Sequence, residues 1–463
     1  MKFIGRKEEL SILKKLYASP NYEGVLVYGR RRIGKSELIK ESLRRFKGKA
    51  IYFECQKASE EFNVRGLSEV IAESFSIPVP NFTSFSEALD FLFKKAERES
   101  IALAIDEYPY VRGKDGKLDS ILQNKIDQYK MSSSLKLIVC GSYIETMEKL
   151  AEESNPLYGR FTMKLDIKEM DYLESSLFYP NASNEDKVAY YSLFGGVPYY
   201  NQFVDDSLSV KENIIDLIAS PRGRLLSEAE GFLNQELHKL SNANETLYAI
   251  ASGHKKFKDI LSQSHVSSSP MLAEILKKLC KMDVIEKVSH INDDSEKKSY
   301  YEIKERLSLF YYQYLFRRNS FFKSMPSDSF FEEFIEKDFF GRYVPRAFEL
   351  IARQYLSIKN RRGEIKPVLY KIGKYYYDDP KNKKNGEFDV VTLSKEGYDF
   401  YEVKFAEGKL DQKVVDIEKA QLKGLEIPYH KLGFVSKNGF DIKDEEDYSL
   451  ISLDDIYALA QEE

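Results

Sequence analysis

The sequence predicts a multidomain α/β protein that begins with a parallel sheet, and three observations predict this class. A chain of 463 residues is too long for one ordinary core and suggests about three domains. Short apolar runs alternate with amphipathic stretches as far as residue 165 or so, which is typical of buried parallel strands joined by helices. Beyond that point the pattern turns helical, and strand candidates return near the C-terminus.

The first domain is expected at residues 1–168. Helical periodicity marks 36–46 and 84–99, between the apolar runs. Buried strands are expected at "GVLVYG" (24–29), "KAIYFEC" (49–55), "SIALAIDEY" (100–108) and "LKLIVCGS" (135–142).

The loop after the first expected strand carries a phosphate-binding pattern. The string "GRRRIGKS" satisfies G-x-x-x-x-G-K-[ST] through Gly29, Gly34, Lys35 and Ser36. Backbone N–H groups of such a loop cradle phosphate oxygens at the positive end of the next helix. Lys35 is expected to reach the β- and γ-phosphates of ATP, and the Ser36 hydroxyl to bind Mg²⁺. A chance glycine turn is the alternative, and the flanking strand and helix patterns disfavour it.

An acidic pair is expected to complete the metal site. Asp106 and Glu107 end the apolar stretch "IALAIDEY". Asp106 is expected to hold Mg²⁺ through water, and Glu107 to polarise the attacking water. Ser142 ends the next strand and is a candidate sensor of the γ-phosphate, with a plain strand-ending turn as the alternative.

Six motifs follow one another along the first 200 residues. They are "FIGRKEEL" (3–10), "YGRRRIGKSEL" (28–38), "AIDEYPYV" (104–111), "IVCGSYIETME" (138–148), "NPLYGRFT" (155–162) and "FGGVPYY" (194–200). In this order they resemble the archaeal-type P-loop ATPases, a branch near the AAA+ and STAND groups. The resemblance implies an AAA+-like P-loop NTPase sheet, a helical lid at 169–238, and ATP or ADP as the bound nucleotide.

The same resemblance implies roles for residues outside the loop. Phe3, Gly5 and Arg6 match the "GR" box that packs against the nucleotide base, and Pro198 matches a lid proline near the adenine. Arg160 matches an arginine that acts as a sensor or finger toward the γ-phosphate, with a structural ion pair as the alternative. Within the loop, at least one arginine is expected to pair with a carboxylate. The remaining expected nucleotide contacts are Arg30, Arg31, Arg32, Ile33 and Glu37.

Residues 239–318 are expected to form a winged helix, with helices followed by a hairpin at 284–303. The segment "SSSPMLAEILKKL" has serine caps and a proline near a helix start. Residues 251–290 contain seven lysines and four acidic residues. Such helices enter a DNA groove in some proteins and act as a packing arm that reports nucleotide state in others. The sequence leaves both readings open.

The C-terminal domain is expected at 319–463, after a polar linker at 317–329. Asp389 lies in an apolar strand, and Glu402 and Lys404 share one face of the next. The pattern D-x12-E-x-K resembles the core of the PD-(D/E)XK restriction-endonuclease-like fold, in which two carboxylates bind Mg²⁺ or Mn²⁺ and the lysine orients the attacking water. Glu349, on an expected helix at 344–356, matches that fold's helical glutamate.

Two more residues are candidate auxiliary groups of this nuclease-like site. Glu387 lies on the same strand face as Asp389, and Gln421 lies on an expected helix at 419–427. A degenerate domain that binds nucleic acid without cutting it, or only mediates assembly, is the alternative.

Composition restricts the setting of the protein. The net charge of −4 means that any basic surface is local. The three cysteines, Cys55, Cys140 and Cys280, lack metal-ligand spacing and indicate a reducing compartment. No apolar run reaches the roughly 18 residues of a membrane helix, and we expect a cytoplasmic protein without a membrane partner.

Three functional hypotheses follow. The first is an ATPase whose nucleotide state regulates a metal-dependent nuclease acting on DNA. The second is a STAND-like nucleotide switch that self-associates and carries a non-cleaving C-terminal domain. The third is a regulator of a protein partner, in which the winged helix is structural.

Overall fold

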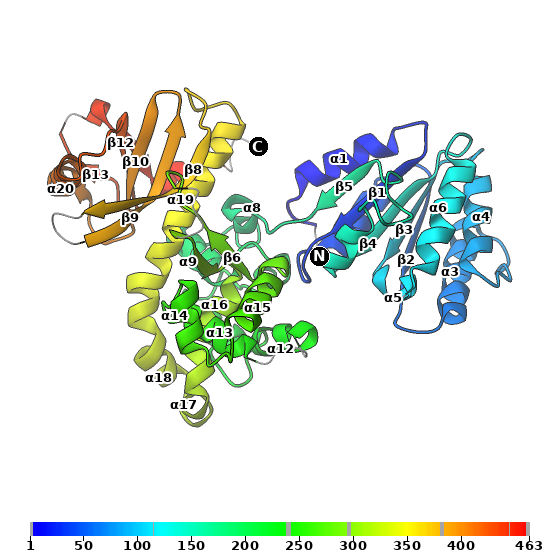
Figure 1. The fold of residues 1–463 in the computed structure, drawn as a ribbon, viewed down its shortest axis with the longest axis horizontal. Coiled ribbons are helices and arrows are strands. Elements are labelled where there is room, and N and C mark those ends of the chain that lie inside the picture. The colour runs from blue at the N-terminus through cyan, green and yellow to red at the C-terminus, as the bar shows by residue number, and fades with distance from the viewer. Residues whose placement is uncertain are drawn as a thin grey trace. The chain divides into compact units, whose positions relative to one another are not determined.

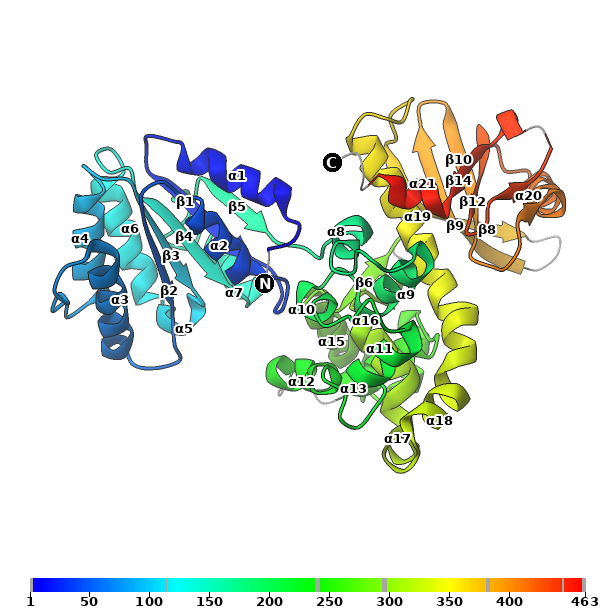
Figure 2. The same cartoon turned by 180° about the vertical axis from the view of Figure 1, so that it is seen from behind.

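The computed structural model describes residues 3–113, 115–237, 242–293, 298–379, 384–443 and 445–459. The chain divides into two compact units, which Figures 1 and 2 show from opposite sides. The first comprises Met1–Met170 with Val197–Tyr199, and the second comprises Asp171–Gly196 with Tyr200–Glu463. The helices expected as a lid therefore group with the C-terminal half, apart from the short segment Val197–Tyr199.

The first unit is built on a five-stranded parallel sheet, as predicted. Its strands run in the order β2-β3-β4-β1-β5. The four expected runs all form strands, and β5 had not been expected. The strands are β1 (Glu23–Tyr28), β2 (Lys49–Glu54), β3 (Ile101–Asp106), β4 (Lys136–Gly141) and β5 (Met163–Asp166).

Helices cover both faces of this sheet (Figure 1). One face packs against α1 (Lys7–Tyr17) and α2 (Lys35–Arg44) through one apolar cluster. The other face packs against α3 (Glu60–Phe75), α4 (Phe85–Lys95) and α6 (Lys117–Tyr129) through a second cluster. The central strands β1, β3 and β4 are buried on both faces, which explains their continuous apolar runs. Two short helices, α5 (Pro109–Arg112) and α7 (Ile144–Lys149), follow β3 and β4.

The second unit begins with helices and a hairpin. The helices are α8 (Tyr172–Ser176), α9 (Asn184–Phe194), α11 (Val210–Leu217) and α12 (Leu226–Leu237), whereas α10 (Pro198–Asn201) starts in the segment that groups with the first unit. Three more helices and a two-stranded antiparallel hairpin then share one apolar cluster. These are α13 (Ala243–Ala251), α14 (Phe257–Gln263), α15 (Ser269–Lys281), β6 (Ile285–Val288) and β7 (Tyr300–Ile303).

The prediction of a polar linker at 317–329 is wrong, because this stretch is helical. It contains the end of a 3-10 turn (Phe316–Arg318), all of α17 (Asn319–Ser324) and the start of α18 (Ser327–Phe331). Phe322 and Phe330 are buried, with their ring centroids 5.3 Å apart. The buried rings anchor the segment, and burying an aromatic ring outweighs a polar composition. The adjoining helical segments are α16 (Arg306–Phe310), the π-helical turns Tyr311–Leu315, Glu332–Glu336 and Phe339–Tyr343, and α19 (Val344–Arg361).

The C-terminal part contains a mixed five-stranded sheet in the order β14-β12-β10-β9-β8. The pairs β8–β9 and β9–β10 are antiparallel, whereas β10–β12 and β12–β14 are parallel. Helix α20 (Gln412–Gly424) adds Val415 and Leu422 to the apolar cluster on one face of the sheet. The strands are β8 (Lys371–Asp379), β9 (Lys384–Ser394), β10 (Gly397–Lys404), β12 (Lys431–Ser436) and β14 (Ser449–Ser452), with a separate pair β11 (Leu410–Asp411) and β13 (Phe440–Asp441), and α21 (Leu453–Ala458) ends the described chain.

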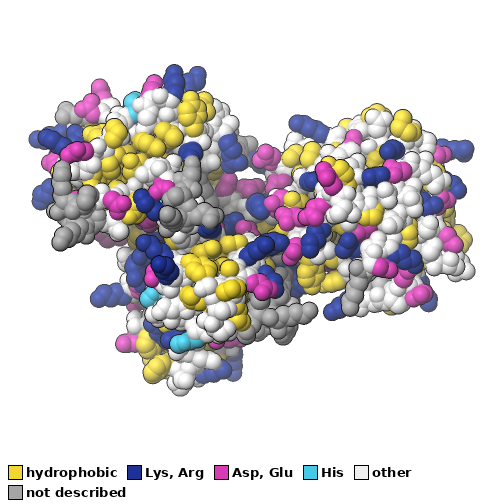
Figure 3. Space-filling model, viewed as in Figure 1, with side chains coloured by type: hydrophobic (Ala, Val, Ile, Leu, Met, Phe, Trp, Pro, Cys, Tyr) yellow, Lys and Arg dark blue, Asp and Glu magenta, His cyan; other side chains and the backbone are white. Residues whose placement is uncertain are grey.

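Two surface properties bear on function. Among the described helices, none combines the length and the apolar character that crossing a membrane requires. In the view of Figure 3, basic and acidic side chains are interspersed on both units. Any nucleic-acid contact on the described surface seen there would therefore be local, in keeping with the small net charge.

Candidate functional site

The predicted phosphate loop joins β1 to α2, at the carboxyl end of the sheet. Gly29 has a φ of 150°, and a Cβ there would lie 2.3 Å from the carbonyl oxygen of Ile167. Gly34 has a φ of 90°, in the region that favours glycine. A Cβ on Gly34 would lie 3.6 Å from Cγ of Pro198. The two glycines thus allow a tight loop that Pro198 approaches closely.

Lys35 lies on this loop. Its ammonium donates hydrogen bonds of 2.9 Å to the carbonyl oxygens of both Gly29 and Arg30. The side chain is buried, and this burial lowers the pKa of Lys35. Its positive charge is thereby held against the loop backbone, next to the amides expected to bind phosphate.

Asp106 and Ser36, predicted 70 residues apart to share a metal, are in direct contact. The Ser36 hydroxyl donates a 2.6 Å hydrogen bond to Oδ2 of Asp106, and the Tyr52 hydroxyl donates a second of 2.6 Å. Burial acts to raise the pKa of Asp106, but the hydrogen bonds from Ser36 and Tyr52 outweigh it and lower that pKa. A hydroxyl and an ionised carboxylate are hard oxygen ligands of the kind Mg²⁺ prefers, so these residues fit the ion that accompanies ATP.

Glu107 is held in a strained conformation beside Asp106. Its φ of 50° lies in the left-handed region that non-glycine residues rarely adopt. Ser142 donates a 3.0 Å hydrogen bond to Oε1, whereas the buried Oε2 has no hydrogen-bond partner among the described residues. One carboxylate oxygen is therefore fixed and the other is available to accept a proton.

The "GR" box supports the loop from beneath. Arg6 is buried, and its guanidinium donates hydrogen bonds to the carbonyl oxygens of Ile33 (3.1 Å) and Lys168 (2.6 Å). Gly5 has a φ of 69°, and Phe3 packs against the apolar cluster that includes Ile33. These contacts link the "GR" box to the phosphate loop, and the predicted packing of the box against the nucleotide base stays a prediction.

The three loop arginines point to different partners. Arg30 forms a 2.9 Å ion pair with Glu169, which is the carboxylate pairing expected for at least one of them. Arg31 donates a 3.1 Å hydrogen bond to the hydroxyl of Tyr143. The guanidinium carbon of Arg32 lies 4.1 Å from the ring centroid of Tyr199, the residue after Pro198.

Two other loop residues offer less to a nucleotide. The side chain of Ile33 is buried in the core beneath the loop, which leaves its backbone for ligand contact. The carboxylate of Glu37 is 64% exposed and lies 3.6 Å from Lys40.

Arg160 is at the wrong end of the sheet for the role that the resemblance implied. It forms a 2.8 Å ion pair with Asp127, and its neighbour Thr162 hydrogen-bonds to the carbonyl oxygen of Gly24, at the amino end of β1. The phosphate loop follows the opposite end of that strand, after Tyr28. The expectation that Arg160 senses the chain's own γ-phosphate is therefore wrong, and the structural ion pair holds instead.

Comparison with known proteins assigns the first unit. Residues 3–202 match the model of an ATPase domain predominantly from Archaea. Over these residues the chain is similar to that ATPase family. Residues 311–419 match a second family, described as archaeal and bacterial proteins of unknown function. That match begins before the expected linker, in agreement with the helical course found there.

The proteins similar to this chain match most of its length. An uncharacterized protein of Methanocaldococcus jannaschii is 27% identical over 98% of this chain and 99% of its own. Among solved structures, a Walker-type ATPase of Pyrococcus abyssi is 21% identical, with a TM-score of 0.49 over 67% of this chain and 96% of that one. The ORC2 protein of Aeropyrum pernix, in ADPNP–ADP complexes, is 12% identical, with a TM-score of 0.45 over 75% and 95%.

The predicted nuclease-like residues lie near one another but do not form a metal-binding group. In the parts of the chain that the structure describes, no three His, Cys, Asp or Glu side chains are arranged to hold a metal ion. Lys374 explains this in part, because its ammonium lies 3.0 Å from Asp389 Oδ1. Lys404 is ion-paired with Glu402 on its own strand. The expected ligand set of Glu349, Asp389 and Glu402 is therefore not met in this structure.

Electrostatics nevertheless mark this region as unusual. Burial, then the charge of Asp389, raises the pKa of Glu349 to about 7. Burial, then the charge of Glu402, raises the pKa of Glu418 on α20 to about 7. Clusters of carboxylates with raised pKa values are more frequent at functional sites than elsewhere. Glu418 was not predicted as a site residue, because in the sequence it is only another acidic residue on a helix that looks exposed.

Gln421 and Glu387 occupy the edges of this cluster. The Gln421 amide donates a 3.3 Å hydrogen bond to the hydroxyl of Tyr377. Glu387 accepts hydrogen bonds from Lys374 (3.1 Å) and from Tyr300 of the hairpin (3.0 Å). Lys374 was also missed, and the only sequence signal was a lysine inside an aromatic strand, "KIGKYYY".

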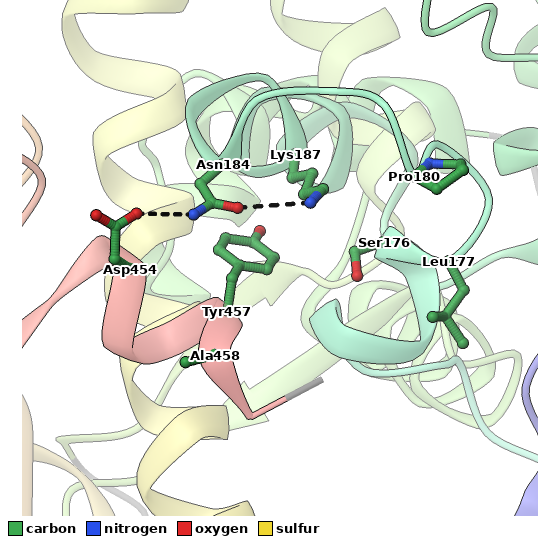
Figure 4. Close-up of a pocket in the computed structure, with 8 residues that line it drawn as sticks. All are labelled: Ser176, Leu177, Pro180, Asn184, Lys187, Asp454, Tyr457 and Ala458. Atoms are coloured by element: carbon green, nitrogen blue, oxygen red, sulfur yellow. Dashed lines mark hydrogen bonds between the residues drawn. The ribbon is translucent and has the colours of Figure 1, made fainter. Parts of the chain in front are cut away.

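A separate cavity of about 440 Å³ lies between the start of α9 and α21 (Figure 4). Asn184 donates a 2.9 Å hydrogen bond to Asp454, and Lys187 points toward Asn184 with its Nζ 3.5 Å from Oδ1. Burial lowers the pKa of Lys187. The cavity contains none of the predicted site residues. Its lining is Ser176, Leu177, Pro180, Asn184, Lys187, Asp454, Tyr457 and Ala458.

Proposed function

We propose that the protein hydrolyses ATP at the loop after β1 and that its nucleotide state controls a DNA-interacting, nuclease-like C-terminal region. The observation that carries the first half is the contact between Ser36 and Asp106 beside Glu107. It joins the phosphate loop to the acidic strand end, as phosphoryl transfer requires.

In this proposal the residues divide the work of hydrolysis. Mg²⁺ bound with ATP neutralises charge on the phosphates, and Ser36 and Asp106 are the residues that would hold it. Lys35 moves from the loop carbonyls to the β- and γ-phosphates. Glu107 orients the attacking water through Oε2 and accepts its proton, while Ser142 keeps the carboxylate in position through Oε1.

The segment Val197–Tyr199 is the proposed route of communication. It groups with the ATPase unit, whereas the chain on either side of it groups with the second unit. Pro198 approaches Gly34, and Tyr199 stacks on Arg32. A phosphate that reorganises the loop would disturb both contacts, and would so act on the chain leading into the helical region.

The second half of the proposal depends on the C-terminal unit. Helices α13, α14 and α15 with the β6–β7 hairpin have the order of a winged helix, and lysines on α15 would serve as phosphate contacts. The succession of α19, β8, β9, β10, α20 and β12 follows the order of the PD-(D/E)XK fold, with Asp389 on its second strand and Glu402 and Lys404 on its third.

A second candidate function is a STAND-like switch or assembly protein with a non-cleaving C-terminal domain. The ion pair between Lys374 and Asp389 favours it, because an ammonium group holds a carboxylate that a nuclease would use for metal. In either case the free thiols of Cys55, Cys140 and Cys280 agree with the cytoplasmic setting we propose.

One experiment separates the two candidates. Linear, branched and single-stranded DNA is incubated with the protein and Mn²⁺, in the presence of ATP or ADP. The first candidate predicts cleavage that depends on the nucleotide and is abolished in Asp389→Asn. Nucleotide-dependent self-association without cleavage of any substrate would instead support the switch.

A further inference from the structure

Lys374 lies at an irregularity in the strand pairing. Gly373 of β8 pairs with Val391 of β9, but Tyr375 pairs with Phe388. One residue of β8, Lys374, therefore faces two residues of β9, one of which is Asp389. This is the arrangement of a β-bulge, with the extra residue on β9. Lys374 lies across the strand pair from Asp389, on the face opposite to that of Gly373 and Tyr375.

The Lys374 side chain is 11% exposed and lies among carboxylates. Its Nζ is 3.0 Å from Asp389 Oδ1, 3.1 Å from Glu387 Oε1 and 3.6 Å from Glu302 Oε1. The ammonium of Lys374 thus lies at the place where the predicted metal would bind.

The β6–β7 hairpin holds this arrangement from the other side. Glu302 of β7 belongs to the carboxylates around Lys374, and Tyr300 of β7 and His290 of the hairpin loop both bond to Glu387. The backbone N–H of Ile291 donates a 2.8 Å hydrogen bond to the carbonyl oxygen of Lys374 itself. The hairpin therefore docks on the bulge through both side chains and backbone.

Gly373 makes this docking possible. A Cβ at position 373 would lie 2.7 Å from Cγ2 of Ile291, closer than real Cβ atoms approach a neighbour. Its φ is not in the left-handed region, so a side chain would strain no dihedral angle there. Hairpin contact is thus the steric reason for glycine at this position.

We propose that Lys374 is the resident cation of the C-terminal carboxylate site and that the β6–β7 hairpin keeps it there. The site accepts a divalent metal only when the hairpin withdraws and Lys374 leaves Asp389. In this proposal the β6–β7 hairpin, which is the wing of the expected winged helix, also blocks metal binding at the nuclease-like site. The inference rests on the proposed nuclease-like character of this region and gives it a means of regulation.

Metal uptake by the full-length, nucleotide-free protein tests this inference. Mn²⁺ is titrated calorimetrically into wild type, Lys374→Met and Gly373→Val. Each titration is repeated with the same protein carrying Asp389→Asn, and the binding heat that this substitution removes is assigned to the site. Gly373→Val keeps every charge and displaces Ile291, and valine suits a strand. It also decides the matter if Lys374→Met fails to fold. Lys149→Met is the control, since Lys149 pairs with Glu145 on its own helix, α7, in the first unit.

We expect no measurable uptake at this site in wild type or Lys149→Met, and measurable uptake, tighter by at least about ten-fold, in Lys374→Met and Gly373→Val. Equal uptake in wild type and Lys374→Met would overturn the inference, as would folded Lys374→Met and Gly373→Val proteins that bind no better than wild type. DNA cleavage is scored separately. Metal uptake in the variants without DNA cleavage would support the blocking role of the hairpin and contradict the proposed nuclease activity.

Discussion

The Ser36 hydroxyl and the Asp106 carboxylate meet at 2.6 Å, although 69 residues separate them along the chain. They meet because α2 starts at the carboxyl end of β1 and Asp106 ends β3 at the same edge of a parallel sheet. The contact defines the end of the ATPase unit at which phosphoryl transfer would occur.

Lys35→Ala should abolish most ATP turnover. The ammonium is the buried cation of the loop, and removing one such group from the transition state costs about 100-fold or more in kcat. Steady-state phosphate release measures the effect. Lys40→Ala is a matched control, because Lys40 lies on the same helix and pairs with the exposed Glu37. Similar rates in the Lys35 variant and wild type would exclude the role assigned to Lys35.

Glu107→Gln should separate binding from hydrolysis. The amide preserves the shape of the side chain but cannot accept the proton of water, so kcat should fall by about 10²- to 10⁴-fold while nucleotide affinity persists. Single-turnover kinetics and nucleotide titration together measure this split. Ser142→Ala should show a smaller loss of about ten-fold, since the Glu107 carboxylate remains and only the hydrogen bond that positions it is removed. A joint loss of affinity and turnover in Glu107→Gln would point to a structural role.

Tyr52→Phe should make the ATPase unit more sensitive to acid. The pKa of Asp106 is lowered in the folded protein, so this group adds stability above its unfolded pKa of about 3.9 and loses it as the pH falls through the folded value. Removing the Tyr52 hydrogen bond raises the folded pKa, so the loss begins at a higher pH. Acid unfolding followed by circular dichroism measures the midpoint, and an unchanged midpoint would contradict the assignment.

Arg160→Ala should leave ATP turnover within about two-fold of wild type. Its ion pair with Asp127 is partly exposed and is worth about 1 kcal/mol or less. Phosphate release and thermal unfolding check the two parts of this expectation. A loss of about 1,000-fold in turnover would restore Arg160 as a γ-phosphate sensor, acting on a nucleotide other than the one held by its own chain.

Glu349→Gln should stabilise the second unit at alkaline pH. The pKa of Glu349 is raised to about 7, so ionisation of this buried group opposes folding as the pH rises from its unfolded value of about 4.3 through 7. The variant removes that penalty, which these two pKa values place at about 1 kcal/mol at pH 5 and about 3–4 kcal/mol at pH 8. Thermal unfolding at both pH values measures the difference. Equal shifts at pH 5 and pH 8 would contradict the raised pKa.

The parts of the site that were predictable are local in sequence. The loop glycines, Lys35 and Ser36 follow from one string of eight residues because backbone geometry and phosphate chemistry impose them together. Asp106 was predicted because an acid that ends an apolar strand, 70 residues after a phosphate loop, is the usual second element of such a site, and it lies 2.6 Å from Ser36. The metal-binding role of Asp389 stays a prediction. Tyr52 was not found, because β2 joins the site only by pairing with β3, and the strand order is not written in any short motif.

The errors have the same origin. Lys374 reaches Asp389 across the β8–β9 pair, and composition does not reveal which residues of two strands lie opposite each other. Arg160 matched a motif, but a motif does not tell which end of the sheet its residues occupy. The stretch 317–329 looked like a linker because its polar residues outnumber the buried rings of Phe322 and Phe330.

Calorimetric titration of the full-length protein with ATP and Mg²⁺ tests the central claim most directly. The account predicts one ATP bound per chain, with binding retained in Glu107→Gln and greatly weakened in Lys35→Ala. A chain that takes up no adenine nucleotide, or takes it up equally well without the Lys35 ammonium, would contradict it.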